Sequence, residues 1–246
     1  VRPQEDFLSL KENFVSSKRV FFENTDVIFS LVRDINQTLE LCEGTDGLFN
    51  LNSSKTLIIC STLSPAFLND FIKKAPENIE VIEAPMSGAP IRAKEASLTF
   101  MVGSTKNQFE TISPILNILG KTIHHIGKFG SGMSVKVLNN FVASCSVVAV
   151  RHVLSEAKNL NISPDQLLEI LNCSSGKTWF SENLHSIDWS KESYNKENTI
   201  GILEKDVNSY LDGLQDAGTE TNEAMQNFQK ALLKGLQNIP DFPNNN

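Results

Sequence analysis

The strongest constraint on the fold is a change of sequence pattern at Gly130. Before this residue, apolar segments of strand length alternate with segments of helical periodicity. The predicted strands are residues 25–34, 55–62, 79–84, 97–103 and 121–126. Parallel strands that helices cover on both faces read as continuous apolar runs. Alternation of this kind indicates βαβ units, so the first half predicts an α/β fold with a mostly parallel sheet.

The second half contains only helical patterns. The predicted helices are residues 131–159, a segment that starts at Pro164 with Ser163 as its N-cap, and residues 199–217 and 220–236. This change of pattern divides the chain into domains. We predict an α/β domain over residues 1–130, an all-helical domain over residues 131–238 and a disordered tail over residues 239–246.

The turn and helix start G-S-G-M-S-V-K-V-L-N-N (residues 130–140) open the longest helical pattern. Lys136 and Asn140 are four residues apart, so they project from the same face of that helix. Residues 141–154 are almost all apolar or small, which is typical of a buried helix. Burial beside a core can lower the pKa of a lysine toward neutrality. The alternative is a solvated lysine near a helix start, which is the default reading of an isolated K-x-x-x-N.

Composition argues against several classes of function. The net charge is −7 and no basic cluster exceeds two residues, so we expect no nucleic-acid partner. No apolar run approaches the roughly 18 residues that a membrane span needs, so we expect no membrane partner. The four cysteines lie far apart in apolar segments, which favours reduced core thiols. The histidines lack partners at ligand spacing, so no metal is assigned.

Several segments together carry a family resemblance. They are E-A-P-M-S-G-A (83–89), S-L-T-F-M-V-G-S (97–104), the 130–140 segment, L-N-C-S-S-G-K-T-W (171–179) and I-L-E-K-D-V (202–207). In this order they resemble motifs of the β-hydroxyacid dehydrogenase family, which includes 3-hydroxyisobutyrate dehydrogenase and tartronate semialdehyde reductase. The 6-phosphogluconate dehydrogenases are more distant relatives. The resemblance implies a Rossmann-type domain that is N-terminally incomplete here, a long interdomain helix, and an all-α domain that helps to form a homo-oligomer.

The resemblance also implies an activity, the NAD(P)-dependent interconversion of a small 3-hydroxy acid and its semialdehyde. Lys136 would be the acid/base that exchanges a proton with the substrate oxygen. Asn140 would hold that oxygen, and Ser87 with the Gly88 amide would bind the carboxylate of the substrate. The residues implied as contacts of the cofactor, NAD or NADP, are Leu31, Val32, Thr62 and Lys205. Each has an ordinary reading too, since Ser-Gly is a common turn pair and Lys205-Asp206 resembles a solvated surface pair.

The chain departs from the family pattern in two places. Residues 1–24 contain no glycine, so they lack the strand–G-x-G-x-x-G–helix unit that binds a pyrophosphate. We therefore expect a missing N-terminal portion or a decayed gene product, and weak NAD(P)H binding by these 246 residues. Ala89, Arg92 and Ala96 stand where relatives have glycines. Alanine restricts the backbone. Arg92 adds a cation that suits a more anionic substrate, or else the pocket has drifted.

Two hypotheses follow. The first is an oxidoreductase of this family, favoured because Lys136, Asn140, Ser87 and Lys205 all persist. The second is a non-catalytic or truncated homologue that serves as an oligomerisation or protein-binding module, favoured by the missing fingerprint and the lost glycines. We expect a cytoplasmic protein, or a mitochondrial one if an N-terminal segment precedes Val1.

Overall fold

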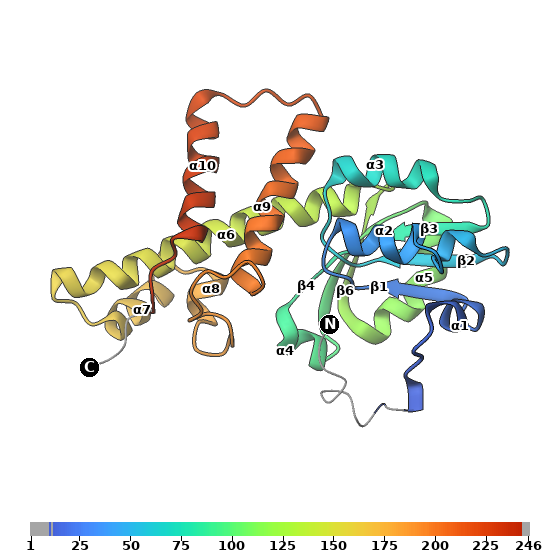
Figure 1. Ribbon diagram of the computed structural model, residues 1–246. Helices are drawn as coiled ribbons and strands as arrows, with labels where there is room; N and C mark the ends of the chain where they lie inside the picture. The colour runs from blue at the N-terminus through green and yellow to red at the C-terminus, as the bar shows by residue number, and fades with distance from the viewer. Residues whose placement is uncertain (1–9, 11, 243–246) are drawn as a thin grey trace. The chain divides into compact units, whose positions relative to one another are not determined.

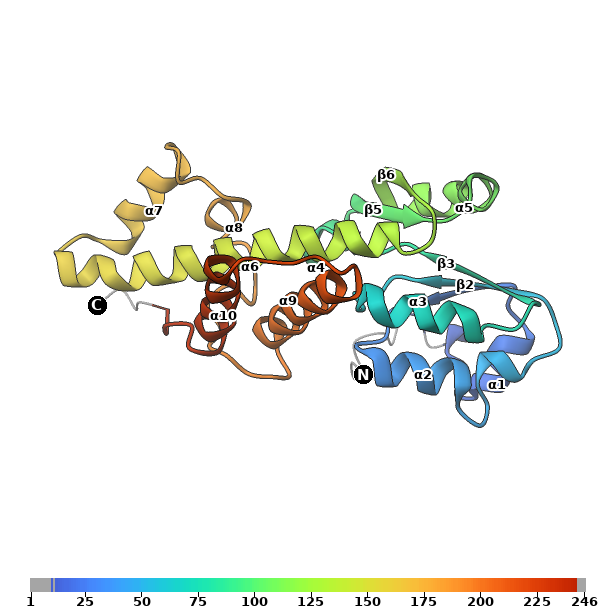
Figure 2. The same cartoon turned by 90° about the horizontal axis from the view of Figure 1, so that it is seen from above.

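The computed structural model describes residue 10 and residues 12–242, and the chain forms two compact units. The first unit combines the described residues up to Ser61 with Asn69–Gly132. The second unit combines Thr62–Leu68 with the described residues from Met133 onward. The sheet lies in the first unit, and the second is helical (Figures 1 and 2). The segment Thr62–Leu68 therefore belongs to the sheet half in sequence and to the helical unit in space.

The sheet of the first unit has six strands in the order β1-β2-β3-β5-β4, and β6 pairs with β5. The strands are β1 (Val27–Ser30), β2 (Lys55–Ile59), β3 (Ile79–Glu83), β4 (Met86–Ser87), β5 (Leu98–Gly103) and β6 (Gly120–Gly127). The strands β1, β2 and β3 run parallel, and so do β5 and β6. The strand β5 runs antiparallel to β3 and β4. The predicted mixed α/β architecture with a parallel-rich sheet is confirmed.

The first two strands end earlier than their apolar runs suggest, because polar residues redirect the backbone to the next helix. The carboxylate of Asp34 accepts a hydrogen bond from the amide of Gln37, 2.9 Å away, and so caps α2 (Ile35–Glu43). Ser64 Oγ accepts from the Phe67 amide at 3.3 Å and caps α3 (Pro65–Lys74). Capping satisfies amide groups that have no partner inside a helix, so a cap residue sets the helix start.

The first unit contains further helical segments beside α2 and α3. They are α1 (Lys18–Glu23), the 3₁₀ turn η2 (Leu48–Asn50), α4 (Ala89–Lys94) and α5 (Lys106–Leu119). The helices α2 and α3 lie side by side in both views (Figures 1 and 2). One core joins the strands to α5 through Ile58, Ile82, Phe100, Ile112 and Leu116.

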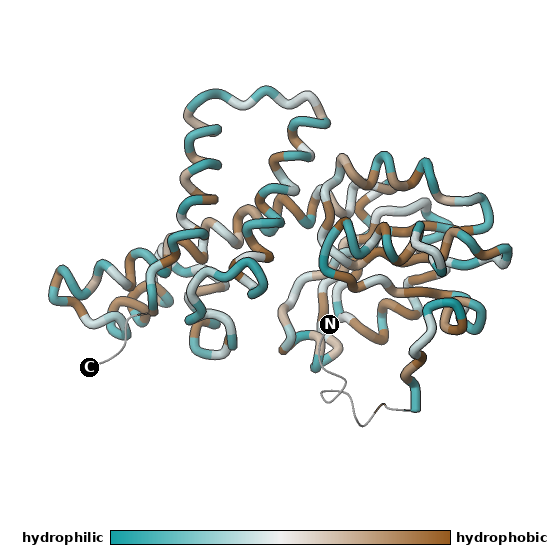
Figure 3. Tube along the Cα trace, in the orientation of Figure 1, coloured by the Kyte–Doolittle hydropathy of each residue, from teal (hydrophilic) through white to brown (hydrophobic). Residues whose placement is uncertain are grey.

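The second unit is built on one long helix. Its elements are α6 (Ser131–Ala157), the 3₁₀ turn η3 (Lys158–Leu160), α7 (Pro164–Asn172), α8 (Trp179–Glu182), α9 (Thr199–Asp216) and α10 (Glu223–Gln237). No strand occurs among the described residues after Ser131, as the sequence predicts. Val147, Val150 and Leu154 of α6 form a core with residues of α7, α8, α9 and α10. Hydrophobic residues recur along α6 in Figure 3.

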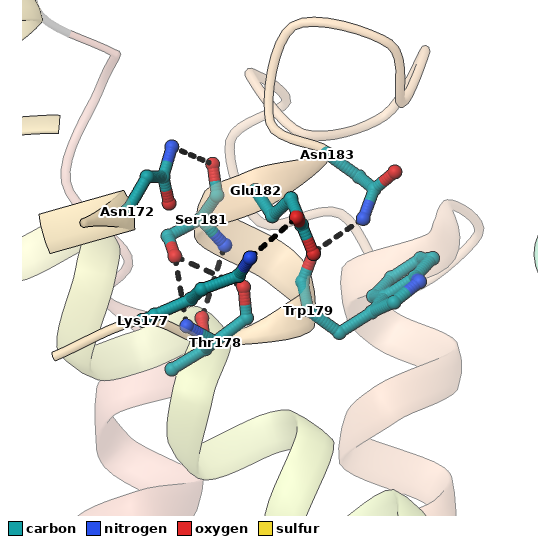
Figure 4. A network of polar contacts seen from close by, with 7 residues as sticks. All are labelled: Asn172, Lys177, Thr178, Trp179, Ser181, Glu182 and Asn183. Atoms are coloured by element: carbon teal, nitrogen blue, oxygen red, sulfur yellow. Dashed lines mark hydrogen bonds and ion pairs between the residues drawn. The ribbon is translucent and has the colours of Figure 1, made fainter. Parts of the chain in front are cut away.

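The short helix α8 is held by side chains at both of its ends (Figure 4). Thr178 and Ser181 form a reciprocal capping box, in which each side chain accepts from the backbone amide of the other. Lys177 and Glu182 form an ion pair at 2.6 Å, and Asn172 donates to the carbonyl of Ser181 at 3.2 Å. The motif that includes Thr178 and Trp179 therefore builds a local helix start.

The sequence predicts a disordered tail over residues 239–246. Within it, the described residues up to Phe242 pack against the protein, and residues 243–246 lie outside the described part of the chain. Ile239 is buried in the core of the second unit, and Phe242 packs against that core. The guanidinium of Arg151, which is fully buried, donates to the carbonyl oxygens of Ser190 and Pro240. A buried cation with backbone acceptors on both sides joins the segment after α10 to α6.

Two further expectations from the sequence need correction. Residues 131–160 form a helix that is long and apolar enough to cross a membrane by length and composition, so the expectation that no apolar run approaches such a length is wrong. The core helix of a soluble protein passes the same test. Cys42 and Cys60 are buried, and burial raises the pKa of each thiol to about 12. Cys173 is exposed, contrary to the expectation that every cysteine is a core thiol.

Candidate active site

The start of α6 is fixed within the first unit by a buried carboxylate. Glu83, at the end of β3, is fully buried, and its Oε1 accepts a hydrogen bond from the Gly132 amide at 2.7 Å. A carboxylate is stabilised at a helix N-terminus, where amide groups and the helix dipole meet. A Cβ atom on Gly103 would lie 1.9 Å from this oxygen, and one on Gly132 would lie 2.3 Å from the Met101 carbonyl. These glycines are required because helix, strand and carboxylate approach so closely.

The two residues that the sequence places on one face of α6 are both buried. Lys136 is 8% exposed and Asn140 is 9% exposed. Asn140 Nδ2 donates to Oδ2 of Asp206, 2.5 Å away, which joins α6 to α9 within the second unit. This bond holds the amide of Asn140 in one orientation. The solvated reading of the K-x-x-x-N pattern is therefore wrong for this chain.

Asp206 is the central acceptor of the cluster. Asp206 is only 2% exposed. The ammonium of Lys205 lies 2.8 Å from Oδ1 of Asp206, but Oδ1 has no hydrogen bond within the described chain, so their contact is an ion pair. Lys205 Nζ also donates to the carbonyl oxygen of Thr62 at 2.5 Å. The buried carboxylate of Asp206 thus contacts the side-chain amide of Asn140 through one oxygen and the ammonium of Lys205 through the other.

The segment after β2 is attached to α9 at a second point. Ser64, which caps α3, donates from its hydroxyl to the carboxylate of Asp212. A Cβ atom on Gly213 would come within 3.1 Å of the Pro65 ring. Together with the bond from Lys205 to Thr62, these contacts explain why Thr62–Leu68 belongs to the helical unit.

The electrostatic surroundings of Lys136 suit an acid/base. Burial lowers the pKa of Lys136 below its ordinary value, the charge of Asp206 acts in the opposite direction, and the charge of Lys205 lowers this pKa further. Desolvation is the largest cause, because it disfavours the charged ammonium. An amine whose pKa is lowered in this way can both give and take a proton closer to neutral pH.

The loop expected to bind the carboxylate lies in the first unit. Ser87 ends β4 and is half-buried, and its hydroxyl has no hydrogen-bond partner among the described residues. Gly88 follows with φ 142°, a conformation that residues with side chains rarely adopt. Ala89 and Ala96 have φ of 56° and 50°, in the left-handed region that favours glycine. At positions 89 and 96 the loop therefore adopts a backbone that favours glycine, although alanine stands there.

The carboxyl ends of the parallel strands offer an edge that fits the ring of a dinucleotide. Leu31 follows β1 directly and is 61% exposed, whereas Val32 beside it is half-buried. Ser61 Oγ, at the end of β2, donates to the Val32 carbonyl at 2.5 Å and fixes this edge. Ligands of such sheets bind outside the carboxyl ends of the strands. An apolar side chain left in solvent at this edge can cover a nicotinamide or adenine ring, so the exposed side chain of Leu31 fits a cofactor ring.

The structure brings some of the predicted site residues together. Lys136, Asn140, Lys205 and Thr62 belong to the second unit, and Asp206 links two of them directly. The others lie in the first unit and are Ser87, Gly88, Leu31 and Val32. Asp206 was assigned no role from the sequence. The signal for it is its position on α9, where it shares the buried face with Leu203 and Val207, because a carboxylate on an apolar face needs a partner.

Two family models match the chain. The NAD binding domain of 6-phosphogluconate dehydrogenase matches residues 3–127. The NAD-binding domain of NADP-dependent 3-hydroxyisobutyrate dehydrogenase matches residues 130–239. Together the two matches cover both the sheet-bearing and the helical parts of the sequence.

Individual proteins are similar over much of the chain. 2-(Hydroxymethyl)glutarate dehydrogenase of Eubacterium barkeri is 31% identical over 160 residues, which make up 64% of this chain and 53% of that protein. Mitochondrial 3-hydroxyisobutyrate dehydrogenase of Rattus norvegicus is 28% identical over 226 residues, 88% of this chain and 66% of that protein. The chain thus spans between half and two-thirds of the length of these relatives. The crystal structure of 3-hydroxyisobutyrate dehydrogenase from Salmonella typhimurium has the same fold, with a TM-score of 0.74, 20% identity, and coverage of 92% of this chain and 80% of that one.

Proposed function

Since this chain belongs to the β-hydroxyacid dehydrogenase family, we propose that it is an NAD(P)-dependent oxidoreductase that interconverts a small 3-hydroxy acid and its semialdehyde. The observation that carries this proposal is the pairing of Lys136 with Asn140 on one face of α6. Lys136 is buried and its pKa is lowered, and Asn140 is oriented by Asp206. A proton-transfer group and a fixed hydrogen-bond donor beside it suit reduction of a carbonyl group.

Lys136 is the acid/base of the proposed reaction. In reduction, its ammonium gives a proton to the carbonyl oxygen as that oxygen gains negative charge. In oxidation, the neutral amine accepts the hydroxyl proton. When bound, NAD(P)H supplies the hydride to the carbonyl carbon, and NAD(P)+ accepts it in the reverse direction. Asn140 donates to the reacting oxygen through the amide that Asp206 holds in place.

The remaining roles follow the family resemblance. Ser87 and the Gly88 amide bind the carboxylate of the substrate. This role is supported by the hydroxyl of Ser87, which has no hydrogen-bond partner in the described part of the chain. Leu31, Val32, Thr62 and Lys205 contact the cofactor. The names of two relatives specify hydroxyisobutyrate and hydroxymethylglutarate. Both compounds carry a hydroxyl and a carboxylate, which supports this class of substrate.

An exposed apolar stripe on α6 supports a homo-oligomer. Leu138, Val142 and Val153 are 50%, 64% and 43% exposed, and they recur at helical spacing on one face. Contiguous exposed apolar surface marks an interaction site. A second copy of the chain would cover this stripe. Light scattering measures the assembly, and a monomer at micromolar concentration would contradict it. The same stripe would serve the alternative, a non-catalytic module, so it does not separate the two functions.

The test that separates them is Lys136→Met. We expect a loss of about 10²- to 10⁴-fold in turnover, the typical contribution of a positioned acid/base. The matched control is Lys128→Met, which removes an exposed lysine in the turn before α6 and should leave turnover unchanged. NAD(P)H absorbance with hydroxy acids and semialdehydes measures both variants. Equal turnover of the wild-type protein and Lys136→Met would remove Lys136 from the mechanism, and no turnover of any substrate by the wild-type protein would favour the module.

A further inference from the structure

We infer that the substrate is a hydroxy acid with a second carboxylate, and that Arg92 binds this second carboxylate. The inference rests on the proposed function, since it takes Ser87 and Gly88 as the site of the first carboxylate. Arg92 belongs to α4, in the loop between β4 and β5, and the family resemblance implies a glycine at its position.

The backbone of Arg92 is fixed on both sides. Its amide donates to the Gly88 carbonyl at 3.3 Å, and its own carbonyl accepts from the Ser97 amide at 2.8 Å. The strand β4 pairs with β5, with Ser87 opposite Thr99. The side chain of Arg92 therefore starts from a defined point relative to Ser87.

The stem of Arg92 lies across Gly88. A Cβ atom built on Gly88 would meet the Cβ, Cδ and Cγ atoms of Arg92 at 2.7, 2.8 and 3.2 Å. These contacts occupy the space that a side chain at position 88 would need. The side-chain carbons of Arg92 therefore pass beside Gly88, and its guanidinium begins one bond beyond the Cδ atom that would touch this position.

The guanidinium has no acidic partner in the described part of the chain. The nearest acidic residue in sequence, Glu95, accepts from the hydroxyl of Ser97 at 3.3 Å instead. Arg92 itself is exposed and forms no ion pair with any described residue. The chain has a net charge of −7, so acidic residues outnumber basic ones. Arg92 lies beside the turn that is proposed to bind a carboxylate and has no acidic partner among the described residues, so its guanidinium can bind an anion from solution.

The chemistry of the two groups explains why two carboxylates fit better than one. The Ser87 hydroxyl and the Gly88 amide are neutral donors that suffice for a single carboxylate. A guanidinium presents a planar fork of donors that matches a carboxylate in a bidentate arrangement. A 3-hydroxy acid with a second carboxylate on its side chain would place one anion on each group.

The experiment compares two acids that differ only by this carboxylate, 3-hydroxyisobutyrate and 2-(hydroxymethyl)succinate. We expect the wild-type protein to prefer the dicarboxylate. Arg92→Met keeps the stem over Gly88 and removes the charge, so it should lower kcat/KM for the dicarboxylate by about 10- to 100-fold, mainly through KM, since a hydrogen bond to a charged group contributes about 1.5–3 kcal/mol. Turnover of the monocarboxylate should not change. Arg92→Lys keeps the charge and loses the fork, so its effect should be intermediate.

Lys94→Met is the control, because Lys94 is an exposed cation on the same helix. Equal losses for both acids in Arg92→Met would mean that Arg92 binds the shared carboxylate, and no loss for either would make Arg92 a surface residue; each result overturns the inference. Calorimetric titration of the dicarboxylate separates this question from catalysis. Binding to the wild-type protein that Arg92→Met weakens supports the Arg92 site even without turnover, whereas no binding to the wild-type protein overturns it.

Discussion

The side-chain amide of Asn140 on α6 donates a hydrogen bond to the carboxylate of Asp206 on α9, 2.5 Å away. The two residues are 66 positions apart in sequence. This bond links the face of α6 that carries Lys136 to the charged pair on α9. The charges of Asp206 and Lys205 act on the pKa of Lys136 in opposite directions, because an anion favours an ammonium and a cation disfavours it. Removing the charge of Asp206 and removing that of Lys205 should therefore shift the pKa of Lys136 in opposite directions.

The first prediction concerns the pH dependence of reduction. The reaction needs protonated Lys136, so activity falls as pH rises through the pKa of this lysine. Asp206→Asn keeps an acceptor for Asn140 and removes a charge that raises this pKa, so the fall should move to lower pH. Lys205→Met removes a charge that lowers the pKa, so the fall should move to higher pH. Profiles of kcat/KM against pH measure both shifts, and shifts in the same direction would contradict this assignment.

The second prediction concerns stability. The pKa of Lys136 is lower in the folded protein than in the unfolded chain, so between these two values the unfolded chain binds more protons. Stability contributed by Lys136 therefore rises with pH in that window, by at most about 1.4 kcal/mol per pH unit. Below the folded pKa the protein bears the full cost of burying the charge. Lys136→Met removes this cost, so its stabilising effect should be largest at low pH and shrink as pH rises toward 10.

Urea unfolding at several pH values between 6 and 10 measures this difference. Lys128→Met provides the baseline, since Lys128 is exposed. A stabilisation by Lys136→Met that grows with pH would contradict a lowered pKa for Lys136.

The third prediction concerns the loop that carries Ser87. Ala89 and Ala96 have positive φ, which costs a residue with a Cβ about 1–2 kcal/mol. Ala89→Gly and Ala96→Gly should therefore each stabilise the protein, by up to about 1 kcal/mol after the entropic cost of glycine is subtracted. Ala93→Gly, in α4 and without positive φ, should destabilise it by about 0.5–1 kcal/mol. Thermal unfolding distinguishes these signs, and destabilisation by all three substitutions would contradict the loop conformation.

Much of the fold was predictable because its signals are local. The capping residues Ser64 and Thr105 mark where α3 and α5 begin. The antiparallel direction of β5 was not predictable, since it depends on how the loop after β3 returns to the sheet. Phe242 packs against Arg151, which lies more than ninety residues earlier in the chain. Composition does not report a contact over such a distance, so it suggested a disordered tail.

The candidate site was predictable only in part. Lys136 and Asn140 stand out because helical periodicity places them together at the start of an apolar helix. Asp206 carried a signal, since it lies on the apolar face of α9, but its amide partner on α6 is evident only from the structure. The positive φ of Ala89 was not predictable either. The sequence shows alanine where the family resemblance implies glycine, but it does not show which backbone conformation that alanine adopts.

The excursion of Thr62–Leu68 into the helical unit means that neither half of this protein corresponds to one continuous stretch of polypeptide. A fragment that starts at Met133 would retain every helix from α7 onward yet lose the carbonyl that receives Lys205 and the hydroxyl that meets Asp212. Lys205 and Asp212 would then need water or other partners in place of these groups. Any attempt to express the helical region by itself should therefore carry residues 62–68 along, either by fusion or as an added peptide.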